Sequence, residues 1–293
     1  MTIGIVPNLA KNNVLEILQR LVLKLAEFKF NILIQESTEL PDDFRDGIRG
    51  FTDFVNYSEF YSQSEIVFTL GGDGTMLSTA FESRNYDVPL VGINLGKLGF
   101  LAEINLDNIG KFIDDIKKGK TIIEERITLE AFCTECPLTK MFAVNDIVID
   151  KGMWPKMIEI TIKVDDEYVS TFSADGVIVA TPTGSTGYSL STGGPIVFPK
   201  AKSIIISPVA PHTLTMRPLV LSCEQKINIT VNSQNKSVQV NCDGQRVNQF
   251  RSPASLQIGK SSRPMRLLHS KDNSYFSILR EKLFWGLDVR QNS

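Results

Sequence analysis

The chain has 293 residues, of which 42% are hydrophobic, and its 31 Lys and Arg residues nearly balance 33 Asp and Glu residues, for a net charge of -2. A chain of this length folds into two domains or one large one with a sizeable core, so it needs no disulfide framework. The near-zero net charge excludes a general nucleic-acid binder, which would carry a basic surface, and favours a small charged metabolite as the ligand.

The sequence shows no targeting signal. The first residues, Met1 to Pro7, include no basic region, and no apolar run approaches the ~18 residues that cross a bilayer. We therefore expect a cytoplasmic protein that does not bind a membrane.

Cysteine and histidine are too sparse to predict a metal site. A four-ligand zinc site needs a second close pair of ligands, and the chain has only one C-x-x-C. We expect no metal centre and four unlinked thiols. The residues concerned are Cys133, Cys136, Cys223, Cys242, His212 and His269.

The first half of the chain alternates strand and helix patterns. Strands that are continuous apolar runs, separated by helices, indicate a parallel sheet covered on both faces. The stretch around Pro41, Gly47 and Gly50 is only loosely patterned. The predicted strands are 2–6, 31–34, 66–70 and 88–93, and the predicted helices are 14–28, behind Asn12 and Asn13 as possible caps, 76–81 and 109–116, the last ended by residues 117–119.

From about residue 121 apolar and polar residues alternate, which is the pattern of half-buried antiparallel strands. The alternation is clearest at Ile158–Val164 and Ile227–Val231, and Asp165-Asp166 and Asp243-Gly244 stand where hairpin turns would fall. Helical spacing returns at Tyr275–Trp285. These patterns predict an α/β domain over residues 1–120 and a β-rich domain over residues 121–268.

The strongest local signal is Gly71-Gly72-Asp73-Gly74-Thr75, between a strand and a helix. Glycines let backbone N–H groups surround a phosphate, and a helix N-terminus adds favourable partial charge. An acid beside phosphates is costly unless it holds a cation or takes a proton from an attacking hydroxyl. The alternative is a tight turn in which Asp73 caps the helix.

Two other nucleotide-binding patterns are not supported. Asn94–Leu101 is a second glycine-rich turn, but Gly92 and Gly96 are one residue too close for a P-loop, and Leu98 replaces the Ser or Thr that would hold magnesium. No G-x-G-x-x-G follows the first strand, so a standard dinucleotide dehydrogenase is not indicated.

The second half carries a long polar segment, Asp175–Pro195, delivered by a buried strand. Its hydroxyls, glycines and Tyr188 suit hydrogen bonds to sugar and amide groups, with an aromatic ring packed on a ligand ring. The alternative is an ordinary Ser/Thr/Gly surface loop. Asn145-Asp146, after a strand-like run, either binds ribose hydroxyls or forms a turn. Serine catalysis is not indicated, because no G-x-S-x-G elbow is present.

Together these segments resemble bacterial NAD kinases in their order and spacing. The resemblance covers nearly the whole chain and includes Leu279–Gly286, which is similar to the C-terminal helix of that family. Diacylglycerol, sphingolipid and 6-phosphofructo kinases share only the segment Gly71–Thr75. The segments are Gly71–Thr75, Asn94–Leu101, Asn145-Asp146, Asp175–Pro195, Pro211–Pro218 and Asp243–Gln245.

The resemblance implies a phosphotransferase that phosphorylates the 2′-hydroxyl of the adenosine ribose of NAD, using ATP and a divalent cation such as Mg²⁺, to give NADP. It also implies a β-sandwich as the second domain, a C-terminal segment (residues 269–293) that returns to the first domain, and a homo-oligomer, either a dimer or a tetramer. Phosphoryl transfer depends mainly on positioning and charge neutralisation, so a glycine cradle, a cation and one carboxylate can suffice.

By the same resemblance Asp73 is the catalytic base and, with Gly74, contacts NAD. Gly71, Gly72, Gly74 and Thr75 form the phosphate loop. Asn145 and Asp146 hold the adenosine part. The remaining NAD contacts implied are Asp175, Thr186, Gly187, Tyr188, Ser189, Leu190 and Ser191. These residues bind adenine and, partly from a neighbouring subunit, the nicotinamide end. Weaker contacts are implied for Lys156, Ser173 and Gln245.

Three positions depart from the family pattern, and two other functions stay open. Asp146 stands where Glu is usual, Gly187 where Ala is usual, and Ser173 where Arg is frequent, which bears on the preference between NAD and NADH. A lipid kinase would share the glycine motif but needs a basic amphipathic segment that the sequence lacks. A non-catalytic nucleotide sensor would have no need for an acid beside phosphate.

Overall fold

The computed structural model describes residues 1–96, 99–271 and 274–284, so four residues of the motifs above, Lys97, Leu98, Trp285 and Gly286, lie outside the described residues. The chain divides into two compact units. Unit 1 is Met1–Glu124 with Arg266–Ser293, and unit 2 is Glu125–Met265. The sequence pattern changes near residues 121 and 268. The units divide a few residues inside those limits because two strands, β7 (Thr121–Arg126) and β20 (Met265–Ser270), extend the sheet of unit 1.

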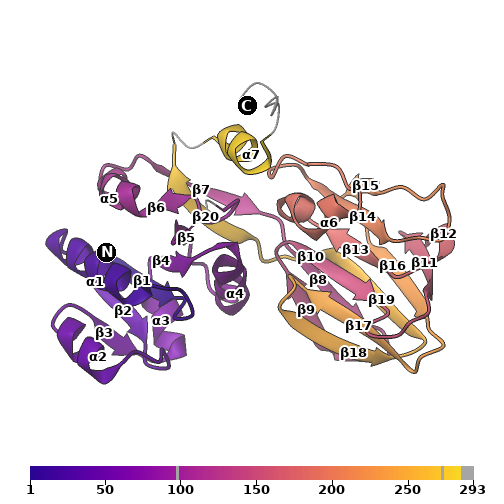
Figure 1. Ribbon diagram of the computed structural model, residues 1–293, viewed down its shortest axis with the longest axis horizontal. Helices are drawn as coiled ribbons and strands as arrows, with labels where there is room; N and C mark the ends of the chain where they lie inside the picture. The colour runs from indigo at the N-terminus through magenta and orange to yellow at the C-terminus, as the bar shows by residue number, and fades with distance from the viewer. Residues whose placement is uncertain (97–98, 272–273, 285–293) are drawn as a thin grey trace, which may run out of the picture. The chain divides into compact units, whose positions relative to one another are not determined.

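Unit 1 is an α/β fold whose described part contains a sheet of eight strands in the order β3-β2-β1-β4-β5-β20-β7, with β6 paired to β5 (Figure 1). Neighbours from β3 to β20 pair in parallel, which confirms the predicted parallel arrangement. The strands are β1 (Thr2–Pro7), β2 (Asn31–Gln35), β3 (Asp53–Val55), β4 (Ile66–Gly71), β5 (Leu90–Asn94), β6 (Ile104–Asn105), β7 (Thr121–Arg126) and β20 (Met265–Ser270). The helices are α1 (Val14–Glu27), α2 (Asp42–Ile48), α3 (Tyr57–Gln63), α4 (Asp73–Ser83), the short 3-10 helix η1 (Leu106–Asn108), α5 (Ile109–Lys117) and α7 (Tyr275–Leu283).

The strand order of unit 1 creates a switch point between β1 and β4. The chain runs from β1 to β2 and β3 on one side, then crosses to β4 and β5 on the other. Right-handed crossovers place α1 and α2 on one face of the sheet and α3 and α4 on the opposite face. Open α/β sheets bind ligands at the carboxyl ends of the strands that border such a switch point.

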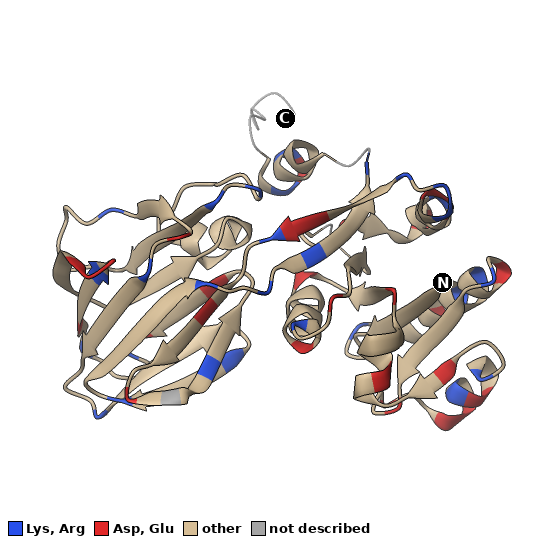
Figure 2. Cartoon of the chain, turned by 180° about the vertical axis from the view of Figure 1, so that it is seen from behind, with Lys and Arg blue, Asp and Glu red and all other residues tan. Residues whose placement is uncertain are grey.

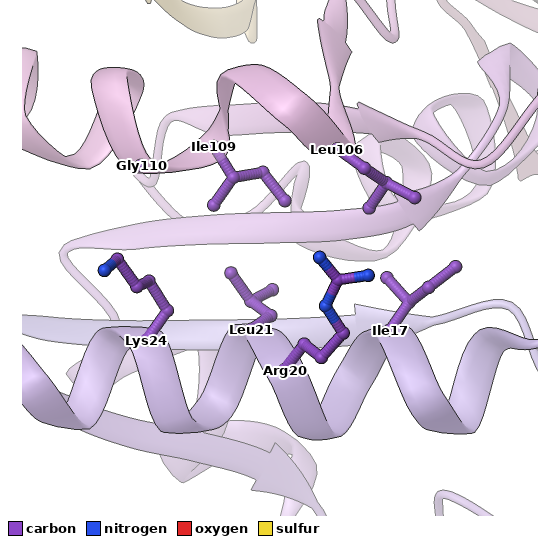
Figure 3. Close-up of a pocket in the computed structure, with 7 residues that line it drawn as sticks. All are labelled: Ile17, Arg20, Leu21, Lys24, Leu106, Ile109 and Gly110. Carbon is purple, nitrogen blue, oxygen red and sulfur yellow. The ribbon is translucent and has the colours of Figure 1, made fainter.

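Helix α1 buries one apolar stripe, including Leu18, Leu21 and Leu25, against the sheet. Asn13 occupies its N-cap position, but with a left-handed φ of 59° and no side-chain hydrogen bond, so the predicted capping by asparagine is wrong. Helices α1 and α5 leave a cavity of about 210 Å³ between them, apolar inside and bordered by two cationic side chains (Figure 3). Its lining residues are Ile17, Arg20, Leu21, Lys24, Leu106, Ile109 and Gly110.

Gly110, in the first turn of α5, gives a test of this packing. A methyl group at Gly110 would meet only Cε of Lys24 at 3.9 Å, an ordinary contact. Gly110→Ala should therefore raise the free energy of unfolding by about 0.4–1 kcal/mol through a less disordered unfolded chain. Gly119→Ala, just beyond the same helix and at φ 64°, should instead destabilise. Thermal unfolding of the two variants checks the opposite signs.

Unit 2 is a sandwich of two antiparallel sheets, and its described strands number six in each sheet. One sheet has the order β15-β14-β13-β10-β17-β18 and the other β12-β11-β16-β19-β8-β9 (Figure 1). The strands are β8 (Leu129–Cys133), β9 (Cys136–Ala143), β10 (Asp146–Asp150), β11 (Ile158–Val164), β12 (Glu167–Ala174), β13 (Gly176–Ala180), β14 (Ser203–Val209), β15 (Leu219–Ser222), β16 (Ile227–Asn232), β17 (Ser237–Cys242), β18 (Arg246–Arg251) and β19 (Ala254–Lys260); the short helices are η2 (Thr183–Thr186) and α6 (Tyr188–Ser191).

The core of unit 2 lies between the two sheets, where the inward residues of β11, such as Ile158 and Ile160, alternate with exposed ones. Both predicted hairpin turns are confirmed: Asp165-Asp166 joins β11 to β12, and Asp243-Gly244 joins β17 to β18. Strand β13 is buried on both faces because Val197 and Val209 pack on its outer side.

Acidic and basic residues are interspersed along each unit (Figure 2). The four cysteines are free thiols, as predicted. Among the described residues, none of the helices is long and apolar enough to cross a membrane. In the same residues, no group of three or more His, Cys, Asp and Glu side chains is arranged to hold a metal ion.

Candidate functional site

The glycine loop of unit 1 lies at the switch point of its sheet. Fully buried β4 ends at Gly71, and α4 begins at Asp73 after Gly72 in extended conformation. The Thr75 side chain fills the place where a Cβ on Gly71 would be, so only glycine fits there. Gly74, in the first turn of α4, is exposed.

Asn8, directly after β1, joins this loop. Its Nδ2 donates to the Thr75 hydroxyl at 3.0 Å, which ties the carboxyl end of β1 to the loop after β4. Asn8 was not predicted from the sequence, because it stands outside any glycine motif. Its position at the end of the first predicted strand was the available signal.

The Asp73 carboxylate does not cap its own helix: α4 has no side-chain capping bond. Instead it accepts hydrogen bonds from three consecutive backbone N–H groups. The donors are Phe100 to Oδ2 at 2.8 Å, and Leu101 and Ala102 to Oδ1, each at 3.0 Å. The structure thus brings together the two glycine-rich turns that the sequence singled out, since these donors follow Gly99.

In unit 2, hydrogen bonds hold the backbone of Asn145 and Asp146 at the start of β10. We call this pair of residues the ledge. The buried carboxylate of Asp243 accepts from the backbone N–H groups of Val144 (3.0 Å), Asn145 (2.7 Å) and Asp146 (3.3 Å). Nη2 of Arg246 pairs with the same carboxylate at 2.7 Å, and the Asp243 side chain is 0% exposed. Asp243, which sequence analysis treated as a turn residue, therefore fixes the backbone of this pair.

The side chains of the ledge carry polar atoms without protein partners. Oδ1 of Asn145 is buried with no hydrogen bond, and the Asp146 carboxylate, in a residue only 5% exposed, receives no donor among the described residues. Burial, and secondarily the negative charge of Asp243, raises the pKa of Asp146 to about 7. Buried polar groups are normally paired, so two unpaired neighbours point to a ligand.

The segment after β13 packs directly on this ledge. Thr181 donates through its backbone N–H to the Asn145 carbonyl at 2.8 Å and through its hydroxyl to the Val144 carbonyl at 2.6 Å. A Cβ on Gly184 would collide with the Asn145 backbone. At Gly187 a Cβ would lie 3.2 Å from the Gly184 carbonyl oxygen and 3.7 Å from Oδ2 of Asp146, so an alanine there would require a small shift of the backbone.

Asp175 and Tyr188 line one cavity of about 360 Å³ in unit 2, with Asp150 and Lys151. Nζ of Lys151 pairs with Oδ1 of Asp175 at 2.6 Å. Burial raises the pKa of Asp150. Asp150 and Lys151 were not predicted from the sequence, because they follow a strand-like run without a recognisable motif.

The other predicted contact residues lie in different surroundings. The Ser189 hydroxyl is buried against Ser207 at 3.0 Å, while Ser191 donates to the Tyr188 carbonyl at 2.8 Å. Thr186 donates weakly to the Thr183 carbonyl, and Leu190 is half-buried. Lys156 is exposed and donates to Gln234 at 3.0 Å, Ser173 is exposed on β12 opposite Glu159, and Gln245 is exposed at the turn that holds Asp243.

Unit 1 is an open parallel sheet with a glycine loop at its switch point. Unit 2 is a sandwich in which the side-chain oxygens of Asn145 and Asp146 lack protein partners among the described residues. Both features are typical of a nucleotide-binding protein. Residues 3–121 match the ATP-NAD kinase N-terminal domain family, and residues 144–270 match the ATP-NAD kinase C-terminal domain family. The chain belongs to the ATP-NAD kinase family, which confirms the resemblance seen in the sequence.

Individual relatives agree with this assignment. The chain is similar to the NAD kinase of Thermoanaerobacter sp. (strain X514), 36% identical over 284 residues that cover 96% of this chain and 98% of the relative. It is 46% identical to the NAD kinase of Clostridium botulinum (strain ATCC 19397 / Type A) over 222 residues, 75% of this chain and 78% of the relative.

Two solved structures share the fold. Yeast NADH kinase, complexed with NADH, superposes with a TM-score of 0.89 at 23% identity, covering 100% of this chain and 90% of that one. An NAD kinase from Archaeoglobus fulgidus in complex with ATP superposes with a TM-score of 0.76 at 26% identity, covering 97% of this chain and 99% of that one. The predicted fold class, an α/β domain with a β-sandwich domain and a C-terminal helix, is confirmed.

Proposed function

We propose that this chain is an ATP-dependent NAD kinase, which transfers the terminal phosphoryl group of ATP to the 2′-hydroxyl of the adenosine ribose of NAD, giving NADP and ADP. Family membership over both units supports this reaction, as do relatives named NAD kinase and the ATP complex of the Archaeoglobus relative. The observation that carries the chemistry is a single carboxylate, Asp73, placed between two glycine-rich turns at the switch point of the sheet.

Asp73 acts as the general base. It takes the proton of the ribose hydroxyl while that oxygen forms its bond to phosphorus and the bond from phosphorus to the ADP oxygen breaks. The backbone of Gly71, Gly72, Gly74 and Thr75 receives phosphate oxygens. No histidine or cysteine is needed, because positioning and neutralisation of charge dominate phosphoryl transfer.

The divalent cation enters with ATP as part of the substrate. Magnesium keeps several waters and is held by one or two carboxylates together with substrate phosphates. Here the free site of Asp73 serves as the base, so the ATP phosphates and waters would hold the ion beside the glycine loop. The ion neutralises phosphate charge when bound.

Asn145 and Asp146 bind the adenosine part of NAD through their unpaired oxygens. The other NAD contacts follow the family pattern: Asp175 and Tyr188 in the unit 2 cavity, Thr186, Gly187, Ser189, Leu190 and Ser191 around it, and Lys156, Ser173 and Gln245 as weaker contacts. For Ser189 the buried bond to Ser207 favours contact through its backbone.

The Asp146 carboxyl predicts a pH dependence of NAD binding. Its pKa of about 7 means that the ionised form, the better acceptor for ribose hydroxyls, is lost as the pH falls below 7. The Kd for NAD should therefore be about tenfold higher near pH 6 than near pH 8. Isothermal titration calorimetry measures this, and Asp146→Asn should flatten the profile. An equal slope in that variant would contradict the assignment.

We also propose a homo-dimer or tetramer and a cytoplasmic location. Exposed apolar residues on the edge strand β15, Leu219 and Val220, support self-association, because edge strands of monomers usually carry charges. Light scattering of the purified chain measures the assembly.

The experiment that tests the function is formation of NADP by the purified chain with NAD, ATP and Mg²⁺. NADH as acceptor and polyphosphate as donor are run in parallel. Binding of NAD without turnover under every condition would favour a nucleotide sensor instead. Phosphorylation of a lipid but not of NAD would favour a lipid kinase.

A further inference from the structure

The hydrogen bonds on Asp73 distinguish its two carboxylate oxygens. Oδ1 accepts two backbone N–H groups, from Leu101 and Ala102, whereas Oδ2 accepts one, from Phe100. A carboxylate has about four lone-pair sites, two on each oxygen. Oδ1 is therefore saturated, and only Oδ2 keeps a site for a further hydrogen bond.

The donating segment is itself held in place. Leu101 and Ala102 are 4% and 0% exposed. The Gly99 N–H donates to the Ala102 carbonyl at 3.0 Å, which closes the turn. A Cβ on Gly92 of β5 would lie 2.5 Å from Cα of Ala102, so the turn packs directly on the sheet backbone. The three donors are thus fixed relative to the sheet that carries Asp73.

Gly99 leaves room for the carboxylate in this arrangement. A methyl group built on Gly99 would overlap Oδ1 of Asp73, and the three heavy atoms nearest to it all belong to the Asp73 carboxyl group. Gly99 lacks a left-handed φ, so alanine meets no backbone strain there. The obstacle is the end of a flexible side chain, and the methyl group would move the carboxylate rather than the fold.

We propose that the backbone N–H groups of Phe100, Leu101 and Ala102, with Gly99, are the positioning element for the base of the reaction. They saturate Oδ1 and present Oδ2 as the oxygen that takes the proton from the acceptor hydroxyl. Gly99 is a positioning residue, because any side chain there displaces the carboxylate. This inference rests on the proposed function for its kinetic consequence, whereas the hydrogen-bonded geometry stands without it.

The kinetic test uses Gly99→Ala. A displaced but chemically intact base should lower kcat by about 10²-fold, since an error of about 1 Å in a reacting group has that effect. KM for ATP should stay within about twofold, because the residues of the phosphate loop are unchanged, so the effect should fall on kcat. The control Gly50→Ala makes the same chemical change elsewhere in unit 1, where no atom lies within 4 Å of the added methyl group. Its kcat and KM should match those of the wild type.

A kcat of Gly99→Ala equal to that of Gly50→Ala would overturn the inference, as would a raised KM with an unchanged kcat. If Gly99→Ala fails to fold, amide hydrogen exchange by NMR decides instead. The N–H groups of Phe100, Leu101 and Ala102 should exchange at least about tenfold faster in Asp73→Ala than in the wild type, because they lose a charged acceptor. Unchanged exchange would overturn the inference even if no NADP forms, whereas failure of the wild type to make NADP refutes only the proposed function.

Discussion

Asp73→Asn should lower the kcat for NADP formation by about 10²–10⁴-fold, the range that a positioned general base contributes. Asparagine keeps the size of the side chain and one carbonyl oxygen for the Leu101 and Ala102 donors, but it cannot accept the hydroxyl proton. Its NH₂ group would also face the N–H of Phe100. Steady-state kinetics with NAD and ATP measures the loss.

The control for this prediction is Asp42→Asn. Asp42 is the first residue of α2, as Asp73 is of α4, and it is exposed. Both variants remove one negative charge from the first turn of a helix, so they share any effect on the helix dipole. Asp42→Asn should keep full activity. An Asp73→Asn protein that retains more than about a tenth of the wild-type kcat would contradict its role as base.

Asp243→Ala should lower the free energy of unfolding by about 3–5 kcal/mol, the usual effect of removing one partner of a buried ion pair. The change removes the carboxylate that Nη2 of Arg246 contacts at 2.7 Å, and it leaves the N–H groups of Val144, Asn145 and Asp146 without this acceptor. The ledge that carries Asn145 and Asp146 should loosen, so NAD affinity should fall as well. Urea-induced unfolding followed by circular dichroism, with NAD titration, measures both effects.

Asp165→Ala is the matched control. Asp165 also has a left-handed φ in a hairpin turn of unit 2, at 49° against 56° for Asp243, so the backbone effect of alanine is similar. It is exposed and accepts one backbone bond, from Lys226 at 2.8 Å. Its replacement should lower the free energy of unfolding by about 1 kcal/mol. Equal losses in the two variants would show that turn geometry, and not the buried pair, stabilises the ledge.

Much of the fold could be predicted because its signals are periodic. Strands β4 and β5 of unit 1 are continuous apolar runs since both of their faces are covered, and β11 alternates because only one of its faces is buried. Helices α2 and α3 and strand β3 were not predicted. Seven-residue helices and a three-residue strand are too short to show a period.

Site residues could be predicted where they form a short sequence motif. They could not be predicted where their role depends on contacts between residues far apart in the sequence. The glycine loop at Gly71–Thr75 is visible in sequence because close backbone approach requires glycine. The contacts of Asp73 with Phe100–Ala102 join residues 27 to 29 positions apart, and the contact of Asp243 with Asn145 joins residues 98 positions apart. Such pairs have no spacing rule, and Asn8 was missed for the same reason.

The identity of the product tests most directly whether the chain transfers a phosphoryl group to the 2′-hydroxyl of NAD. The purified chain is incubated with NAD, ATP and Mg²⁺, with Asp73→Asn as control. The product is examined by phosphorus NMR and by reduction with a dehydrogenase that accepts only NADP. We expect a new monoester phosphate at the 2′ position, competent in the dehydrogenase assay, from the wild type alone. A product phosphorylated elsewhere, or equal NADP formation by Asp73→Asn, would contradict the account.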